Sequence, residues 1–198
     1  SINPIVIPYG IEFPKILNDD KSNISTLGYL GKLNKNKGIE DLIDVYEKLL
    51  KKENFNKLEP NLLIGGVGSK NYISSINKRI SNKNIQFLGY VEDRYNFFNS
   101  IKVFIFPSYS EGLGLVLLEA MSHGVLCITR DVTPMNSIIK NGENGFLFKD
   151  NNELIEKIEK AINLNTSEKD KIVKSALEKI EKSYSIMQMY LSIDKAYN

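Results

Sequence analysis

Residues 104–124 read FIFPSYSEGLGLVLLEAMSHG and combine a short apolar strand, a glycine-containing turn and an apolar helix. The strand VFIF at 103–106 ends at Pro107, and Gly112 and Gly114 precede the main helical run. A strand that passes through such a turn into a helix offers an anion free backbone N–H groups and the positive end of the helix dipole. This segment therefore predicts an anion site at the start of the helix.

Two glutamates stand on either side of the helix start. Glu119 has almost only apolar neighbours, so its carboxylate needs a polar partner if it is buried. Uninterrupted helical rise from Glu111 to Glu119 would place the two carboxylates about 12 Å apart. This exceeds the roughly 5–9.5 Å between the carboxylates of glycoside hydrolases and suits a long ligand with hydroxyl groups at its ends and phosphates between them. The alternatives are a solvated helix-end charge for Glu111 and a basic partner for Glu119.

Alternating strands and helices run through most of the chain. Apolar runs typical of buried strands lie at 26–30, 61–65, 85–89, 103–106, 125–129 and 145–148. Helical patterns separate them at 39–52, 70–80, 93–100, 113–123 and 135–140, and only helices follow, at 151–163, 167–182 and 185–197. These patterns predict an α/β fold, a Rossmann-like doubly wound parallel sheet of about six strands with C-terminal helices.

In such a sheet a ligand binds at the carboxyl ends of the strands. Lys32 and Lys37 flank the loop after the first strand, where two cations would neutralise a diphosphate. A solvated lysine-rich loop is the alternative. Gly65, Gly66 and Gly68 follow the second strand, but the third glycine and the later acid of a dinucleotide fingerprint are missing. We therefore expect these glycines to form a tight turn.

Composition narrows the class of protein. The 198 residues suffice for one domain with a substantial core, and a net charge of +2 from scattered lysines argues against nucleic-acid binding. A single cysteine, Cys127, a single histidine, His123, and the lack of a D-x-D triplet argue against a metal site. The sequence shows no signal-peptide pattern and no apolar run of about 18 residues, so we expect a cytoplasmic location.

Taken in order, several segments resemble a known family. PSYSEGLGLVLLEAMSHGVLCI at 107–128 resembles the E-x7-E region of family 4 retaining glycosyltransferases of the GT-B fold. GYLGKLNKNKG at 28–38 resembles the diphosphate loop of that family, and LLIGGVGSK at 62–70 resembles its second strand and glycine-rich turn. IQFLGYV at 85–91 is similar to the strand leading to the nucleotide base, and INPIVIPYGI at 2–11 to the interdomain linker. The ordered set is specific, whereas each motif alone is weak.

The resemblance implies roles for individual residues. Glu111 would be the catalytic residue and contact the donor sugar near its anomeric carbon, either as a nucleophile or as an orienting and electrostatic group. Glu119 would accept hydrogen bonds from the ribose hydroxyls, and the diphosphate would be held without a metal or other cofactor. The residues implied in binding the nucleotide-sugar are Gly31, Lys32, Lys37, Gly66, Tyr90 and Val91 (near the base), Gly112, Leu113, Gly114, Leu115 and Glu119.

The resemblance also implies a division into domains. Residues 1–20 would be an interdomain linker remnant, 21–165 the nucleotide-sugar-binding domain, and 166–198 helices that pack toward a missing N-terminal acceptor domain. The chain would be one half of a GT-B enzyme of polysaccharide biosynthesis, transferring a hexosyl group with retention to a glycan or lipid-linked acceptor. Alone it would bind the nucleotide-sugar without transferring the sugar. Any membrane association would come through the full-length enzyme or a lipid-linked acceptor.

Two other functions remain open. Lys32 stands where the family usually has arginine, and Ser137 where it usually has glutamate, so one alternative is a non-catalytic module that binds a nucleotide-sugar. The other alternative is a nucleotide-sugar epimerase of the GT-B fold.

Overall fold

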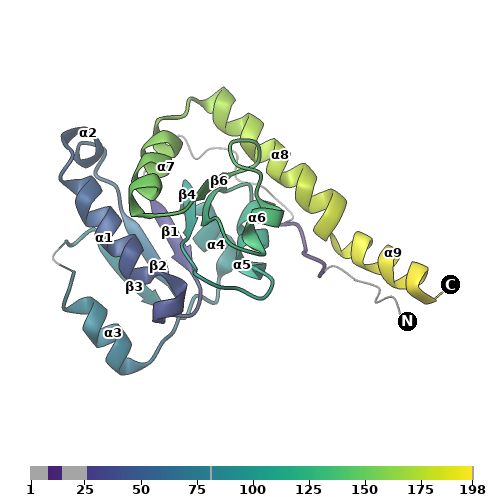
Figure 1. Ribbon diagram of the computed structural model, residues 1–198, viewed down its shortest axis with the longest axis horizontal. Helices are drawn as coiled ribbons and strands as arrows, with labels where there is room; N and C mark the ends of the chain where they lie inside the picture. The colour runs from purple at the N-terminus through teal and green to yellow at the C-terminus, as the bar shows by residue number, and fades with distance from the viewer. Residues whose placement is uncertain (1–8, 15–25, 81, 198) are drawn as a thin grey trace.

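The computed structural model describes residues 9–14, 26–80 and 82–197 (Figure 1). Within these residues six parallel strands form one sheet in the order β3-β2-β1-β4-β5-β6. The strands are β1 (Leu27–Leu30), β2 (Leu62–Gly65), β3 (Ile85–Gly89), β4 (Val103–Phe106), β5 (Leu126–Arg130) and β6 (Phe146–Phe148). The predicted α/β, Rossmann-like fold is therefore confirmed.

Except for the short α2, which the sequence patterns do not predict, the helices lie where those patterns predict them, most of them with shifted ends. They are α1 (Ile39–Leu50), α2 (Glu53–Asn56), α3 (Lys70–Asn77), α4 (Arg94–Asn99), α5 (Leu115–Ser122), α6 (Met135–Ile138), α7 (Asn151–Asn163), α8 (Thr166–Tyr184) and α9 (Ile186–Tyr197), with a 3-10 turn η1 at Lys35–Lys37. Helix α5 begins later than predicted because Gly114 is left-handed, with φ of 67°. Residues 111–114 are therefore not helical. The expected separation of about 12 Å between the carboxylates of Glu111 and Glu119 assumed a continuous helix, so that assumption is wrong.

Helices cover both faces of the sheet (Figure 1). Helix α1 packs against α7, and α5 packs against α8. All residues of β1, β4 and β5 are buried. Burial on both faces explains why these strands read as continuous apolar runs instead of alternating with polar residues.

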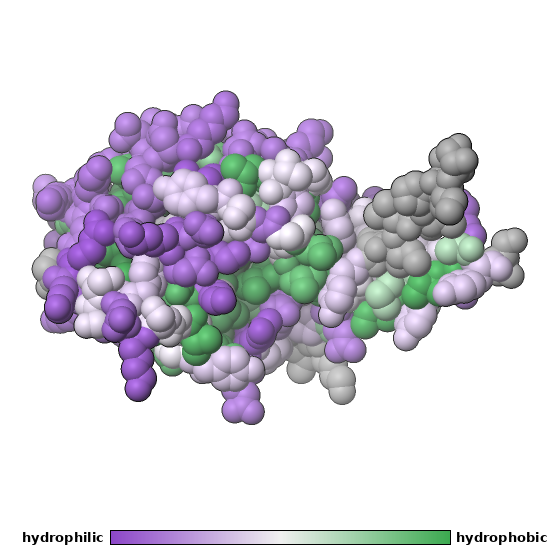
Figure 2. Space-filling model, turned by 60° about the horizontal axis from the view of Figure 1, so that its bottom comes forward, coloured by the Kyte–Doolittle hydropathy of each residue, from purple (hydrophilic) through white to green (hydrophobic). Residues whose placement is uncertain are grey.

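The C-terminal helices extend beyond the sheet. Asn165 and Glu168 form a capping box that starts α8, and α9 continues away from the body (Figure 1). Apolar side chains are visible on the projecting end (Figure 2), and none of the described α9 residues is buried. No helix in the described ranges is both long and apolar enough to cross a membrane.

A short part of the predicted linker lies against these helices. Of the predicted segment 1–20 the structure describes 9–14, and the remaining positions lie outside the described residues. The backbone N–H of Ile11 donates to the carbonyl of Tyr184 at 2.6 Å. A Cβ added at Gly10 would lie 2.7 Å from Cα of Ile186. Segment 9–14 is thus tied to the junction of α8 and α9.

The turn after β2 requires a glycine. Gly66 has φ of 137°, and a Cβ there would lie 1.7 Å from the carbonyl oxygen of Gly31. We expect Gly66→Ala to lower the free energy of unfolding by about 3 kcal/mol or more, since backbone strain and a backbone clash add together. Urea unfolding measures this. The control is Gly112→Ala, which meets no atom within 4 Å and should change stability by less than about 0.5 kcal/mol. Equal stability of the two variants would contradict the described turn.

Candidate functional site

The predicted site residues gather at one edge of the sheet. The loops at 31–38, 66–69, 90–93 and 107–114 follow β1, β2, β3 and β4, so they all leave the carboxyl ends of parallel strands. Strands β1 and β4 are neighbours, yet the chain continues from β1 to β2 on one side and from β4 to β5 on the other. Ligands of doubly wound sheets bind in the crevice at such a reversal of strand order.

Two predicted residues meet at this reversal. Nζ of Lys37 donates to Oε1 of Glu111 at 2.6 Å and to the carbonyl of Ser110 at 3.3 Å. The side chains of Lys37 and Glu111 are only 20% and 15% exposed. Partial burial strengthens their attraction relative to bulk water. The structure therefore places a cation and a carboxylate, 74 positions apart in the sequence, at the point expected for a ligand.

The backbones of the same two loops are also joined. The N–H of Tyr109 donates to the carbonyl of Asn36 at 2.9 Å, and the Ser108 hydroxyl donates to the same oxygen at 3.3 Å. A Cβ at Gly38 would lie 2.3 Å from the carbonyl oxygen of Pro107. The approach is so close that the loop bearing Lys37 requires glycine at position 38.

Arg130, at the end of β5, packs against the 107–114 loop. The sequence alone did not predict a role for it. Its side chain is 7% exposed, and Nη2 donates to Oδ2 of Asp41 at 2.6 Å while Nε donates to the carbonyl of Pro107 at 3.0 Å. Its guanidinium lies over the Tyr109 ring, 4.0 Å from the centroid. Tyr109 also donates to Asp41, and this hydrogen bond raises the pKa of Tyr109. One signal was available: an arginine directly after the apolar run VLCIT requires a partner.

The turn after β1 rests on a buried tyrosine. The hydroxyl of Tyr29 donates to the carbonyl of Lys32 at 3.0 Å, and the N–H of Gly31 donates to the carbonyl of Gly65 at 3.1 Å. Burial raises the pKa of Tyr29, and the charge of Glu111 raises it further, so the hydroxyl remains a neutral hydrogen-bond donor. The turn is fixed from beneath, while Lys32 itself is exposed at the edge.

The start of α5 presents backbone N–H groups. Within the described residues, the N–H groups of Gly112, Leu113, Gly114 and Leu115 donate no hydrogen bond to the protein. Gly112 and Leu113 are exposed, and the first turn of α5 carries no acidic residue. These are the properties that make a helix start favourable for an anion.

Glu119 has a basic partner, the alternative that the sequence left open. Nη1 of Arg94, the first residue of α4, donates to both carboxylate oxygens at 2.8 and 2.6 Å. The Glu119 side chain is 28% exposed, so it is partly accessible to solvent and is not buried in the core. Sequence reasoning missed Arg94, because its place at the start of the predicted 93–100 helix does not show which distant residue it meets.

The remaining predicted residues lie on the β3 side of the edge. Tyr90 is 72% exposed directly after β3. Val91 is half-buried and lies close to Gly65: a Cβ added at Gly65 would lie 2.7 Å from Cγ2 of Val91. His123 caps the end of α5, where its ring packs 4.9 Å from that of Phe98.

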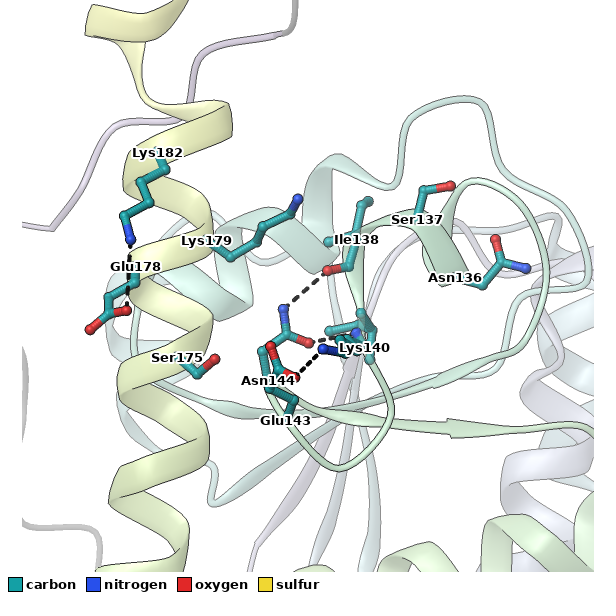
Figure 3. A pocket seen from close by; sticks show the side chains of 11 residues that line it. Asn136, Ser137, Ile138, Lys140, Glu143, Asn144, Ser175, Glu178, Lys179 and Lys182 are labelled. Atoms are coloured by element: carbon teal, nitrogen blue, oxygen red, sulfur yellow. Dashed lines mark hydrogen bonds and ion pairs between the residues drawn. The ribbon is translucent and has the colours of Figure 1, made fainter.

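A cavity elsewhere on the molecule contains none of the predicted site residues. It has a volume of about 470 Å³ and lies between α6, the turn that follows and α8 (Figure 3). Lys140 pairs with Glu143 within the turn, and Lys182 lies 4.0 Å from Glu178 on α8. Lys179 also lines the cavity, with its Nζ 5.9 Å from the centroid of the Tyr184 ring. The cavity therefore contains charged groups, but none that the sequence predicts to hold the nucleotide-sugar.

Comparison with known proteins assigns the chain to a family. Residues 11–179 match the family described as "Glycosyl transferases group 1". The chain belongs to this family of glycosyltransferases, which confirms the resemblance seen in the sequence motifs.

The chain is 32% identical over 191 residues to the capsular polysaccharide biosynthesis glycosyltransferase CapM of Staphylococcus aureus, which covers 94% of this chain and 48% of CapM. Anabaena Alr3699/HepE, crystallised with UDP-glucose, is similar with a TM-score of 0.78 and 20% identity over 88% of this chain and 49% of that one. The C-terminal domain of the group 1 protein LpcC from Francisella tularensis is similar with a TM-score of 0.72 and 21% identity over 91% and 97%. The chain thus spans about half the length of the curated relatives it matches.

The buried Arg130 pair should matter for stability. We expect Arg130→Ala to lower the free energy of unfolding by about 3–5 kcal/mol, because it leaves the carboxylate of Asp41 without its cation. The control is Arg79→Ala: Arg79 is 46% exposed and pairs with Glu40 and Asp44, so its loss should cost less than about 1 kcal/mol. Chemical unfolding of both variants tests this, and equal losses would contradict a supporting role for Arg130.

Proposed function

We propose that this chain is the nucleotide-sugar-binding domain of a glycosyltransferase that transfers a hexosyl group, with retention, to a glycan or lipid-linked acceptor. The observation that carries the proposal is the contact of Lys37 with Glu111 at the reversal of strand order. It unites a diphosphate-neutralising cation with a carboxylate suited to the sugar, at the usual ligand position of the fold. The name of CapM and the UDP-glucose bound to Alr3699/HepE support the same reading.

The site accommodates a nucleotide-sugar in an extended arrangement. In our proposal Tyr90 and Val91 lie at the base and Glu119 at the ribose. The diphosphate lies between the lysine-bearing loop and the start of α5, with Gly31 and Gly66 allowing close approach of the backbone. The groups that hold it are Lys32, Lys37 and the N–H groups of Gly112, Leu113, Gly114 and Leu115. Because these groups already neutralise phosphate charge, we propose that no metal or other cofactor is required.

The arrangement favours departure of the nucleoside diphosphate. Negative charge develops on the diphosphate as the bond from the anomeric carbon to phosphate oxygen breaks. Lys37 and the N–H groups at the start of α5 are positioned before the reaction and stabilise this charge. Glu111, adjacent to Lys37, would face the sugar, either as a nucleophile or as an orienting and electrostatic group.

We also propose that the chain works with an N-terminal acceptor domain. The coverage of 48% of CapM and 49% of Alr3699/HepE supports this, as does the exposed apolar surface of α9. Residues 21–165 would bind the nucleotide-sugar, and residues 166–198 would pack toward the acceptor domain. Segment 1–20 would be the linker, and its described part already contacts the start of α9. The isolated chain would bind the nucleotide-sugar without transferring the sugar.

Calorimetric titration without added metal tests the binding site. We expect one of UDP, GDP or ADP, with its sugar conjugates, to bind, and Glu119→Ala to weaken binding by about tenfold or more, or about 1.4 kcal/mol, since the ribose acceptors are lost. The control is Glu143→Ala, which removes a carboxylate of the α6–α8 cavity and should leave affinity unchanged. Absence of binding to every nucleotide would contradict the proposal.

Catalysis is tested in the protein joined to its N-terminal domain. We expect Glu111→Gln to lower the rate of sugar transfer by about a hundredfold or more. Affinity for the nucleotide-sugar should stay within about threefold or tighten, because Lys37 is released for the diphosphate. Analysis of the product anomer by NMR tests retention. A changed nucleotide-sugar without transfer would favour an epimerase, and binding without any reaction would favour a non-catalytic module.

A further inference from the structure

Arg94 connects the two parts of the edge that would hold the nucleoside. It begins α4, four positions after Tyr90, and Asp93 caps this helix by accepting from the N–H of Asn96 at 2.9 Å. From there its guanidinium reaches Glu119 on α5. The proposed base loop and the proposed ribose carboxylate are thus linked by one side chain.

Packing between α4 and α5 holds this pair in place. The ring of His123 lies 4.9 Å from that of Phe98 and 5.8 Å from that of Tyr95. Phe98 is fully buried, so the two helices form a fixed support beneath Arg94 and Glu119. A side chain that binds a ligand gains from such support because less conformational freedom is lost on binding.

The geometry leaves acceptor capacity on Glu119. A single nitrogen of Arg94 spans both carboxylate oxygens, at 2.8 and 2.6 Å. A carboxylate oxygen accepts about two hydrogen bonds, so each oxygen of Glu119 retains a place for one more donor. Two neighbouring oxygens with one free place each match the two hydroxyl donors of a vicinal diol.

We propose that Arg94 is a positioning residue that holds the Glu119 carboxylate ready for the 2′- and 3′-hydroxyls of the nucleotide ribose. This inference rests on the proposed function and deepens it. It names a residue that makes the protein bind a ribonucleotide more tightly than the corresponding 2′,3′-dideoxynucleotide. Arg94 stays on Glu119 when the nucleotide binds. It is not a competitor that must leave.

The test compares a nucleoside diphosphate with its 2′,3′-dideoxy analogue by calorimetry, using UDP, GDP and ADP as probes. We expect the wild-type protein to bind the ribose form about tenfold or more tightly than the dideoxy form. In Arg94→Ala this preference should fall to about threefold or less, while affinity for the dideoxy form stays unchanged. Arg94→Lys should restore part of the preference, because an ammonium keeps the charge without the planar geometry.

Arg79→Ala serves as the matched control. Arg79 is an arginine of similar exposure, 46% against 44% for Arg94, that pairs with acids on α1 and should leave the preference intact. An unchanged preference in Arg94→Ala, an equal loss for both nucleotide forms, or tighter binding of the nucleoside diphosphate by this variant would overturn the positioning role. Failure of the wild-type protein to bind any probe would overturn the proposed function and this inference with it.

Discussion

The ion pair between Lys37 and Glu111 joins the two loops that leave the sheet where its strand order reverses. From β1 the chain turns toward β2, and from β4 it turns toward β5, so the following helices diverge and leave the loops between them exposed to a ligand. Their backbones still touch, because Gly38 has no side chain to separate the η1 turn from Pro107. This close contact keeps a cation and a carboxylate together at the edge.

Rigidity beneath the loops comes from a buried charge. Arg130 bonds the carbonyl of Pro107, the carboxylate of Asp41 and, through its face, the ring of Tyr109. A buried arginine destabilises the fold unless acceptors satisfy its charge and its N–H groups, since an unpaired buried charge is costly. Because its partners come from α1 and from the loop that carries Glu111, Arg130 couples both of them to β5. These contacts hold the loop that carries Glu111 in a fixed position at the edge of the sheet.

Much of the fold could be predicted from local pattern, and the failures have physical causes. The strands were found because burial on both faces makes them continuously apolar. Element ends were less accurate: α5 starts at Leu115 because Gly114 adopts a left-handed conformation, and α1 stops at Leu50 before the separate turn α2. The partners of Glu111 and Glu119 were harder to predict, because Lys37 and Arg94 resemble many other surface cations in the sequence.

By itself the sequence determined the order of strands and helices along the chain, the glycine turns at the strand ends and the family resemblance. These features depend on burial patterns and backbone preferences that neighbouring residues specify. Only the tertiary structure decided which distant charges meet. Arg130 finds Asp41 across 89 positions, and Arg94 finds Glu119 across 25. These pairings depend on strand order and on the packing of helices against one sheet. Both arise from long-range contacts across the whole core, which no local stretch of sequence specifies.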